Sequence, residues 1–398
     1  MTTAFERGSL AEIFWVFLRL GCTSFGGPVA HLGYFRTELV ARRSWLTEAT
    51  FADLVALCQF MPGPASSQTG MAIGLLRGGP IGMLLAWIGF TLPSALAMTL
   101  FAYGVAELGD LSNAGWLHGL KLVSVAVVAQ AVWGMAKTLA PDRDRATVAG
   151  AACLVCLAQP TTLGQIGALV LGALAGIFAL PRETRTSLPE AALNTGIPRG
   201  LAFFLLLLFL ALLLVSLWAT GQHVLDLFNT FYRAGSLVFG GGHVVLPLLQ
   251  SAVVPPHWVG QDVFLAGYGA TQAMPGPIFT FAAFLGAVET PAPNGWLGAI
   301  IATVAIFLPS FLLVSGLLPF WDTLRNWPTI RAAMRGVNAA VVGVLLAALF
   351  NPIWIGSVHG SADFAVGLIA FLMLMFWSVP PWLVVAFGAA AGWTLGLV

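Results

Sequence analysis

Three cationic side chains lie inside apolar segments, where a charge is costly: Arg19, Lys121 and Arg233. A charge at the centre of a membrane helix costs about 2.5–3.5 kcal/mol, and a bound anion would offset much of that cost. Arg19 and Arg233 lie 214 positions apart, and each precedes a Phe-Gly-Gly motif. We therefore predict that these cations contact an anionic substrate. The alternative is that the two arginines snorkel to the membrane surface or pair with Glu12 and Asp226.

Two glycine- and proline-rich interruptions follow each of these arginines. Phe25-Gly26-Gly27 recurs 214 positions later as Phe239-Gly240-Gly241, and Met61-Pro62-Gly63-Pro64 recurs 213 positions later as Met274-Pro275-Gly276-Pro277. Glycine reaches backbone angles closed to other residues, and proline ends a helix because it lacks an N–H group. A helix that restarts after such a break presents unpaired N–H groups, which bind oxyanions. We predict that the motifs line an oxyanion site; the alternative is that they are kinks for close helix packing.

Further polar residues near the motifs complete the predicted site. Ser66 adds a hydroxyl donor after the first Met-Pro-Gly-Pro motif, whereas Ile278 and Phe279 follow the second. We therefore expect an asymmetric site. Gln59 and Gln272, which also lie 213 positions apart, are predicted to line it.

Proton coupling would need a group that changes its charge within the membrane. The candidates are His31, His243, Asp53, Glu12 and Asp226. For the histidines, the alternative role is a hydrogen bond to a carbonyl group that the break leaves free. For Asp53, the alternative is an N-cap at the start of a helix.

The composition excludes several classes of function. Of the 398 residues, 59% are hydrophobic and 8% are charged, which is typical of a membrane protein and not of a soluble one. We find no basic arm for nucleic acid, no nucleophile with a neighbouring base and no phosphate-binding loop. Cys153 and Cys156 form a CxxC pair inside an apolar stretch without further ligands nearby. We therefore expect no enzymatic activity, no cofactor, no metal site and no nucleic-acid partner.

The motifs belong to an internal duplication, because further pairs such as Trp45 and Trp258 keep the same order and nearly the same spacing. We predict a first repeat at residues 1–180, a cytoplasmic linker with one orienting transmembrane helix at 181–220, and a second repeat at 221–398. The expected fold is an all-α polytopic membrane protein. It would consist of two inverted-topology repeats with broken or re-entrant helical hairpins.

The order of spans explains the inversion. Residues 9–40 and 51–76 are predicted to form hairpins that return to their starting side. Membrane spans should follow at about 80–104, 115–138, 146–160 and 162–180. The additional span at 201–220 would then give the second repeat the opposite orientation in the membrane.

The distribution of basic residues agrees with this topology. If the N-terminus is cytoplasmic, 14 of the 17 Lys and Arg residues lie in predicted inner segments, all except Arg19, Lys121 and Arg233. The predicted outer loops, near 105–114, 251–261, 288–295 and 351–363, hold none. This one-sided distribution is what the positive-inside rule requires.

The motifs resemble those of the chromate ion transporter (CHR) family in its long, two-domain form. The resemblance rests on Phe25-Gly26-Gly27-Pro28 with His31, on its second-half counterpart ending in Gly242-His243, and on both Met-Pro-Gly-Pro motifs. It covers nearly the whole chain. It implies a multi-pass exporter of chromate in the bacterial inner membrane, driven by protons or the membrane potential, with sulfate as a structural analogue. A transporter of sulfate or another oxyanion, a passive anion channel and a homodimeric assembly all stay open.

Overall fold

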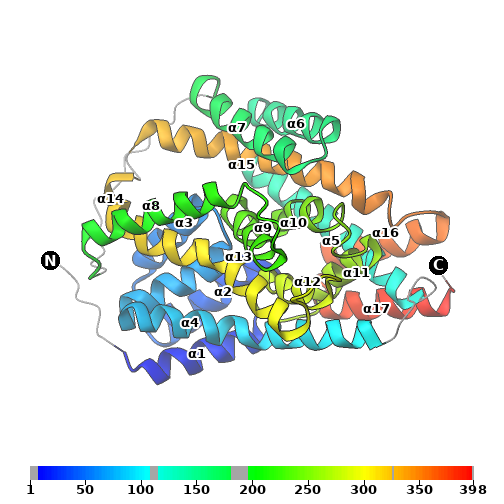
Figure 1. Cartoon of the computed structure of the whole chain (residues 1–398), viewed down its shortest axis with the longest axis horizontal. Coiled ribbons are helices and arrows are strands. Elements are labelled where there is room, and N and C mark those ends of the chain that lie inside the picture. Colours follow the sequence, from blue (N-terminus) through cyan, green and yellow to red (C-terminus); the bar gives the residue numbers. More distant parts are fainter. Residues whose placement is uncertain (1–7, 108–114, 181–195, 325–326, 397–398) are drawn as a thin grey trace.

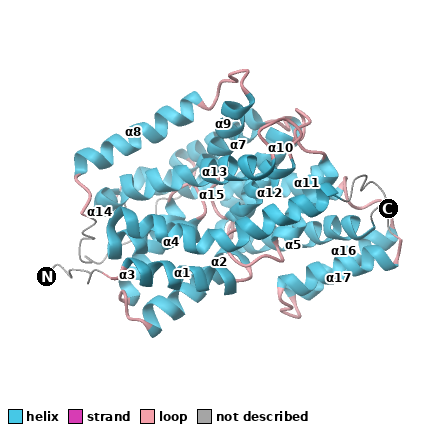
Figure 2. Cartoon of the chain, turned by 60° about the horizontal axis from the view of Figure 1, so that its bottom comes forward, coloured by secondary structure: helices cyan, strands magenta, loops and turns pink. Residues whose placement is uncertain are grey.

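The computed structural model describes residues 8–107, 115–180, 196–324 and 327–396. Within these ranges the secondary structure is helical, without strands (Figure 1 and Figure 2). Four helical segments are long and apolar enough to cross a membrane: Ala65–Glu107, Gly115–Leu139, Gly295–Phe320 and Pro328–Trp354. The prediction of an all-α membrane protein is confirmed.

The first half begins with two interrupted helical pairs. They are α1 (Leu10–Thr23) with α2 (Gly27–Phe35) and the π-helix Arg36–Arg42, followed by α3 (Glu48–Phe60) with α4 (Ala65–Glu107). The interruptions at residues 24–26 and 61–64 hold the predicted motifs. α4 is interrupted again at Gly79, whose φ is 65°. Its two parts pack together, since a Cβ atom placed on Gly74 would lie 2.8 Å from Cβ of Ala86.

The second half repeats this order after α8 (Arg199–Val215). Its elements are α9 (His223–Leu237), the 3-10 helix Gly242–Val244 with α10 (Val245–Val253), α11 (Gln261–Thr271), the 3-10 helix Ile278–Thr280 with α12 (Phe281–Val288), and α13 (Gly295–Leu317). The 3-10 helix Leu318–Phe320 and α14 (Trp321–Leu324) follow. The helices are interrupted at residues 238–241 and 272–277, which again hold the motifs.

The remaining helices of each half pack on the other half. They are α5 (Gly115–Leu139), α6 (Arg143–Ala158) and α7 (Thr162–Phe178) in the first half, and α15 (Pro328–Ala348) with the π-helix Leu349–Trp354, α16 (Ser361–Met375) and α17 (Pro381–Thr394) in the second. α6 and α7 lie on α15 (Figure 1), whereas α16 and α17 lie on α5. The halves therefore exchange their last helical pairs.

Glycines allow this exchange because they let helix backbones approach closely. A Cβ atom on Gly172 of α7 would lie 2.7 Å from the carbonyl oxygen of Gly336 on α15. A Cβ atom on Gly388 of α17 would lie 3.0 Å from the carbonyl oxygen of Gly119 on α5. Equivalent contacts thus recur on both sides of the molecule.

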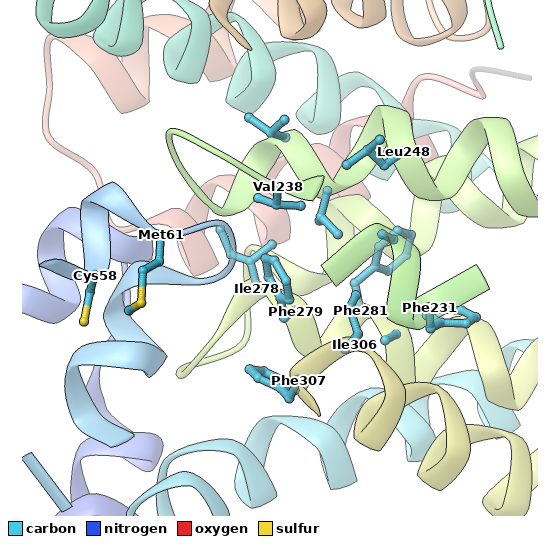
Figure 3. Packing of buried hydrophobic residues seen from close by; sticks show 14 of the residues in the cluster. Cys58, Met61, Phe231, Val238, Leu248, Ile278, Phe279, Phe281, Ile306 and Phe307 are labelled. Atoms are coloured by element: carbon cyan, nitrogen blue, oxygen red, sulfur yellow. The ribbon is translucent and has the colours of Figure 1, made fainter. Parts of the chain in front are cut away.

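Large apolar side chains pack around the helix that restarts after the second Met-Pro-Gly-Pro motif (Figure 3). Ile278, Phe279 and Phe281 are buried there, and the rings of Phe279 and Phe307 lie 5.7 Å apart between centroids. Lipid is as apolar as these side chains, so their close packing, rather than removal from water, stabilises the contact. This packing holds the start of the restarted helix in place beside the break.

Candidate functional site

The Met-Pro-Gly-Pro motif of each half is hydrogen-bonded to the chain just before the Phe-Gly-Gly motif of the other half. The backbone N–H of Gly63 donates to the carbonyl oxygen of Val238 at 2.7 Å. The backbone N–H of Gly276 donates to the carbonyl oxygen of Ser24 at 2.9 Å. Both glycines have positive φ, 121° at Gly63 and 93° at Gly276. The four breaks are therefore linked in two equivalent pairs that cross between the halves.

Two serines, one on α4 and one on α13, lie against these linked breaks. A Cβ atom on Gly276 would lie 2.9 Å from Oγ of Ser94 on α4, and one on Gly63 would lie 2.9 Å from Oγ of Ser310 on α13. Each serine follows a proline within its helix. A serine of the other half thus lies beside each glycine, and at Gly63 the side chain of Gln68 lies closer still.

The two Phe-Gly-Gly motifs also approach each other. A Cβ atom on Gly27 would lie 3.8 Å from Nε2 of His243, and one on Gly242 would lie 3.4 Å from Cγ of Pro28. The side chain of Ile278, just after the second Met-Pro-Gly-Pro motif, would lie 3.8 Å from a Cβ atom on Gly27 and 3.6 Å from one on Gly242. Three of the four breaks therefore converge on one place.

A small cavity of about 40 Å³ lies at this place, and we name it the central cavity. It is lined by Gly26, Gly27, Val127, Gln130, His243, Thr271, Gln272, Met274, Gly276, Ile278, Leu374 and Pro381. A cavity of about 10–15 Å³ on this measure holds one water molecule, so the central cavity has room for a small solute. Residues from both halves of the chain enclose it.

The lining of the central cavity is polar, and the described residues that form it include no carboxylate, lysine or arginine. Nε2 of Gln272 donates to Oγ1 of Thr271 at 3.1 Å, and Nδ1 of His243 lies 2.7 Å from Oη of Tyr268. α2 starts at Gly27, and the short helix before α12 starts at Ile278, so two helix N-termini border the cavity. An anion here would meet amide donors and positive helix ends.

The equivalent region at the first Met-Pro-Gly-Pro motif is closed by its own side chains. Nε2 of Gln68 donates to the carbonyl oxygen of Pro62 at 2.6 Å and to Oγ of Ser310 at 3.3 Å. Nδ1 of His31 lies 3.3 Å from Oγ of Ser66, and both side chains are buried. Gln59, the counterpart of Gln272, is exposed on α3. The arrangement is asymmetric, and the cavity lies at the second motif.

Arg19 borders a different and larger cavity, which we name the Arg19 cavity. Its volume is about 550 Å³, and it is lined by Arg19, Leu20, Thr23, Ala30, Gly33, Tyr34, Thr37 and Glu38. The Arg19 side chain is exposed and has no ion pair among the described residues. The same α1–α2 hairpin contributes Gly26 and Gly27 to the central cavity. Arg19 is thus placed near the hairpin break but outside the central cavity.

The other predicted cations lie away from both cavities. Arg233 is half-buried and donates to the carbonyl oxygen of Ser216, at the end of α8. Nζ of Lys121 lies 3.0 Å from Oδ1 of Asp262 on α11, which forms an ion pair between the halves. Neither residue lines the central cavity or the Arg19 cavity.

The predicted acids have partners other than the two arginines. Glu12 pairs with Arg43 at 2.9 Å, and Asp226 accepts from the backbone N–H of Thr220 at 2.7 Å. Asp53 is half-buried on α3, whose N-cap is Thr47. The alternative in which Asp53 caps this helix is therefore wrong. None of the three acids borders the central cavity.

A buried acid–histidine pair that the sequence did not reveal lies at the end of α12, in a predicted outer loop. Nε2 of His223 lies 3.1 Å from Oε2 of Glu289, whose residue surface is 3% exposed. Burial raises the pKa of Glu289 to about 8, and burial lowers the pKa of His223. Near neutral pH the pair therefore consists of a protonated carboxyl and a neutral imidazole.

Glu289→Gln is expected to stabilise the protein more strongly as the pH rises. The pKa of Glu289 is higher in the folded protein than its ordinary value of 4.5, so folding disfavours its ionised form. The wild type loses stability as the pH rises from about 4.5 to about 8, and the glutamine variant lacks this loss. The Tm difference between the variant and the wild type in detergent should be larger at about pH 8 than at about pH 5. An equal difference at both pH values would contradict this account.

Comparisons with known proteins match both halves of the chain. The sequence profile of the family described as "Chromate transporter" matches residues 11–177 and again residues 225–393. The chain is 29% identical over 399 residues to a probable chromate transport protein of Synechococcus elongatus, covering 96% of this chain and 95% of the relative. It is 26% identical over 352 residues to the chromate transport protein of Cupriavidus metallidurans, covering 86% and 82%.

A chromate transport protein of Pseudomonas aeruginosa is 29% identical over 357 residues, covering 85% of this chain and 79% of the relative. No solved structure matches the chain significantly. The profile spans both halves, and these relatives match over most of their length. The chain is therefore a multi-pass membrane protein that belongs to the chromate transporter family.

Proposed function

We propose that this protein is a secondary active transporter that moves chromate out of the cytoplasm, and that it is not an enzyme. The observation that carries the proposal is the central cavity, where breaks of both halves meet at a small polar space. A tetrahedral dianion that enters it must exchange water for other donors. Backbone N–H groups, Gln272 and the helix N-termini beside Gly27 and Ile278 provide neutral donors of the kind that binds oxyanions.

The remaining predicted residues take supporting roles in this proposal. Arg19 attracts the anion into the Arg19 cavity, from which it passes the α1–α2 break. Gly26, Gly27 and Gly276 let the backbone approach the anion, and His243 is the residue placed to exchange a proton beside it. The other motif residues shape and hold the breaks: Phe25, Pro62, Gly63, Pro64, Phe239, Gly240, Gly241, Pro275 and Pro277.

We further propose that the two halves are inverted repeats at residues 1–180 and 221–398, joined through 181–220. The crossed hydrogen bonds and the exchanged helical pairs support this arrangement, since both recur in equivalent form in the two halves. Rocking of one half against the other would open the central cavity alternately to each side. The distribution of Lys and Arg supports a cytoplasmic N-terminus in a bacterial inner membrane. One chain supplies both sides of the cavity, so a monomer suffices.

Flux measurements on the purified protein test this function. Proteoliposomes containing the full chain should accumulate labelled chromate against its concentration gradient when a membrane potential or a pH gradient is imposed. Liposomes without protein are the control, and excess sulfate shows whether the site accepts other tetrahedral dianions. Flux that only follows the chromate gradient would identify a passive channel, and transport of sulfate without chromate would identify a different substrate.

A further inference from the structure

Two histidines and an aspartate meet outside the central cavity, where α5 and α16 both begin. The potential ligand atoms of His118, His359 and Asp363 all lie within 4.8 Å of one another. Nε2 of His118 lies 2.9 Å from Oδ1 of Asp363, and the rings of His118 and His359 stack with centroids 5.8 Å apart. We propose that these three side chains form a binding site for a divalent transition-metal ion, with Zn²⁺ as the best fit.

The donor set selects the class of metal. Two imidazole nitrogens and one carboxylate oxygen suit Zn²⁺ and its neighbours, whereas Ca²⁺ and Mg²⁺ prefer oxygen ligands alone. Zinc bonds to nitrogen and oxygen are about 2.0–2.2 Å long, so tetrahedral ligands lie roughly 3.4 Å apart. Nε2 of His118 and Oδ1 of Asp363 already lie within this ligand-to-ligand distance of each other. His359 is exposed, so its side chain can move the remaining distance of at most roughly 1.4 Å.

The surroundings of His118 and Asp363 differ in how firmly they hold the two side chains. Its Nδ1 atom is buried and has no hydrogen-bond partner among the described residues. Nδ1 lies on the other side of the ring from Nε2, so an ion bound through Nε2 would not contact it, and the proposal rests on the three ligand atoms. Oδ2 of Asp363 accepts from the backbone N–H of His359 at 2.8 Å, which fixes the orientation of the carboxylate. The carboxylate of Asp363 is thus held in place before any ion binds.

The position of the cluster links it to the central cavity. α5 and α16 run side by side from the cluster and meet again where Nε2 of Gln130 donates to the carbonyl oxygen of Leu374 at 3.5 Å. Gln130 and Leu374 both line the central cavity. At a rise of 1.5 Å per residue, the cavity lies roughly 16–18 Å along both helices from the cluster. A bound ion would tie a helix of the first half to one of the second and restrain their relative motion.

The sequence predicted no metal site because its ligands come from distant parts of the chain. His118 lies in the first half, and His359 and Asp363 lie in the second. No short spacing of histidines marks the site, and only the exchange of helical pairs brings α16 onto α5. The exchange is therefore what creates this cluster.

Metal binding to the purified full chain tests the proposal without any measurement of chromate. Protein treated with a chelating resin should bind one equivalent of ZnCl₂ in isothermal titration calorimetry. Co²⁺ should give the visible absorption of a four-coordinate ion at the same stoichiometry. His359→Ala removes an exposed ligand and should weaken Zn²⁺ binding by about 10-fold or more, with loss of the Co²⁺ spectrum. Asp363→Asn should weaken binding as well.

His257→Asn is the matched control. His257 is exposed, lies outside the cluster and has a φ of 60°, which asparagine tolerates. This variant should bind Zn²⁺ like the wild type. Absence of saturable binding in the wild type would overturn the proposal, and so would unchanged affinity in His359→Ala. Because His359 is exposed, its loss should leave the Tm of the metal-free protein unchanged, which separates lost binding from misfolding.

Discussion

Gly276→Ala is expected to abolish chromate transport and to lower the Tm of the purified protein by several degrees. Gly276 has a φ of 93°, where a residue with a side chain is strained by about 1–3 kcal/mol. The added Cβ atom would also lie 2.9 Å from Oγ of Ser94 and 3.1 Å from the carbonyl oxygen of Phe90. Relief of this contact would pull the N–H of Gly276 away from Ser24, which links the two halves.

Two further variants test the strained φ of Gly276 and its close contact with Ser94 separately. Gly260→Ala is the matched control, because Gly260 has a φ of −66° and a Cβ atom there would contact nothing within 4 Å. Its Tm and transport rate should equal those of the wild type. Ser94→Ala combined with Gly276→Ala removes the close hydroxyl oxygen but leaves the strained φ, so it should recover part of the lost Tm. A Gly276→Ala protein with wild-type Tm and flux would show that the crossed link does not hold the breaks.

The positions of the breaks could be predicted from sequence because they depend on local chemistry. Glycine and proline within an apolar run interrupt a helix wherever the rest of the chain lies. The structure accordingly interrupts its helices at residues 24–26, 61–64, 238–241 and 272–277. The all-α membrane fold could be predicted for the same reason, since long apolar segments decide it without reference to tertiary contacts.

The pairing of the breaks could not be predicted in this way. Two copies of each motif allow either half to pair its own motifs or to pair them with those of the other half. The choice depends on contacts between residues more than 170 positions apart, such as Gly63 with Val238. Helix periodicity carries no information about such contacts. The exchange of α6 and α7 with α16 and α17 is hidden for the same reason.

The role of individual polar residues was also hidden by the duplication. Arg19 and Arg233 are equivalent in sequence, yet Arg19 is exposed in a large cavity while Arg233 bonds the end of α8. The difference comes from α8. The carbonyl group of Ser216 at its C-terminal end binds Arg233, and the described residues before α1 contain no equivalent helix. Equivalent positions thus meet different neighbours, and sequence symmetry alone overestimates the symmetry of the site.

Gln272→Leu is expected to reduce chromate transport by about 10- to 100-fold while the protein still folds. Leucine is close in size to glutamine but removes the amide donor from the central cavity. A hydrogen bond to a charged group contributes about 1.5–3 kcal/mol, which corresponds to that loss in rate or affinity. The contacts of Gln272 with Thr271 and with the Tyr268 carbonyl lie within the same short segment, so their loss should lower the Tm little. Initial flux rates over a range of chromate concentrations measure the effect.

Gln59→Leu is the matched control, since Gln59 occupies the equivalent position in the first half but is exposed on α3. If the central cavity binds the substrate, this variant should transport chromate at the wild-type rate. A symmetric site lined by both glutamines, as the duplication alone suggests, would instead lose activity in both variants to a similar degree. Wild-type flux in Gln272→Leu would remove the central cavity from the transport path. The pair of variants therefore decides between the site implied by sequence symmetry and the one-sided site formed by the folded chain.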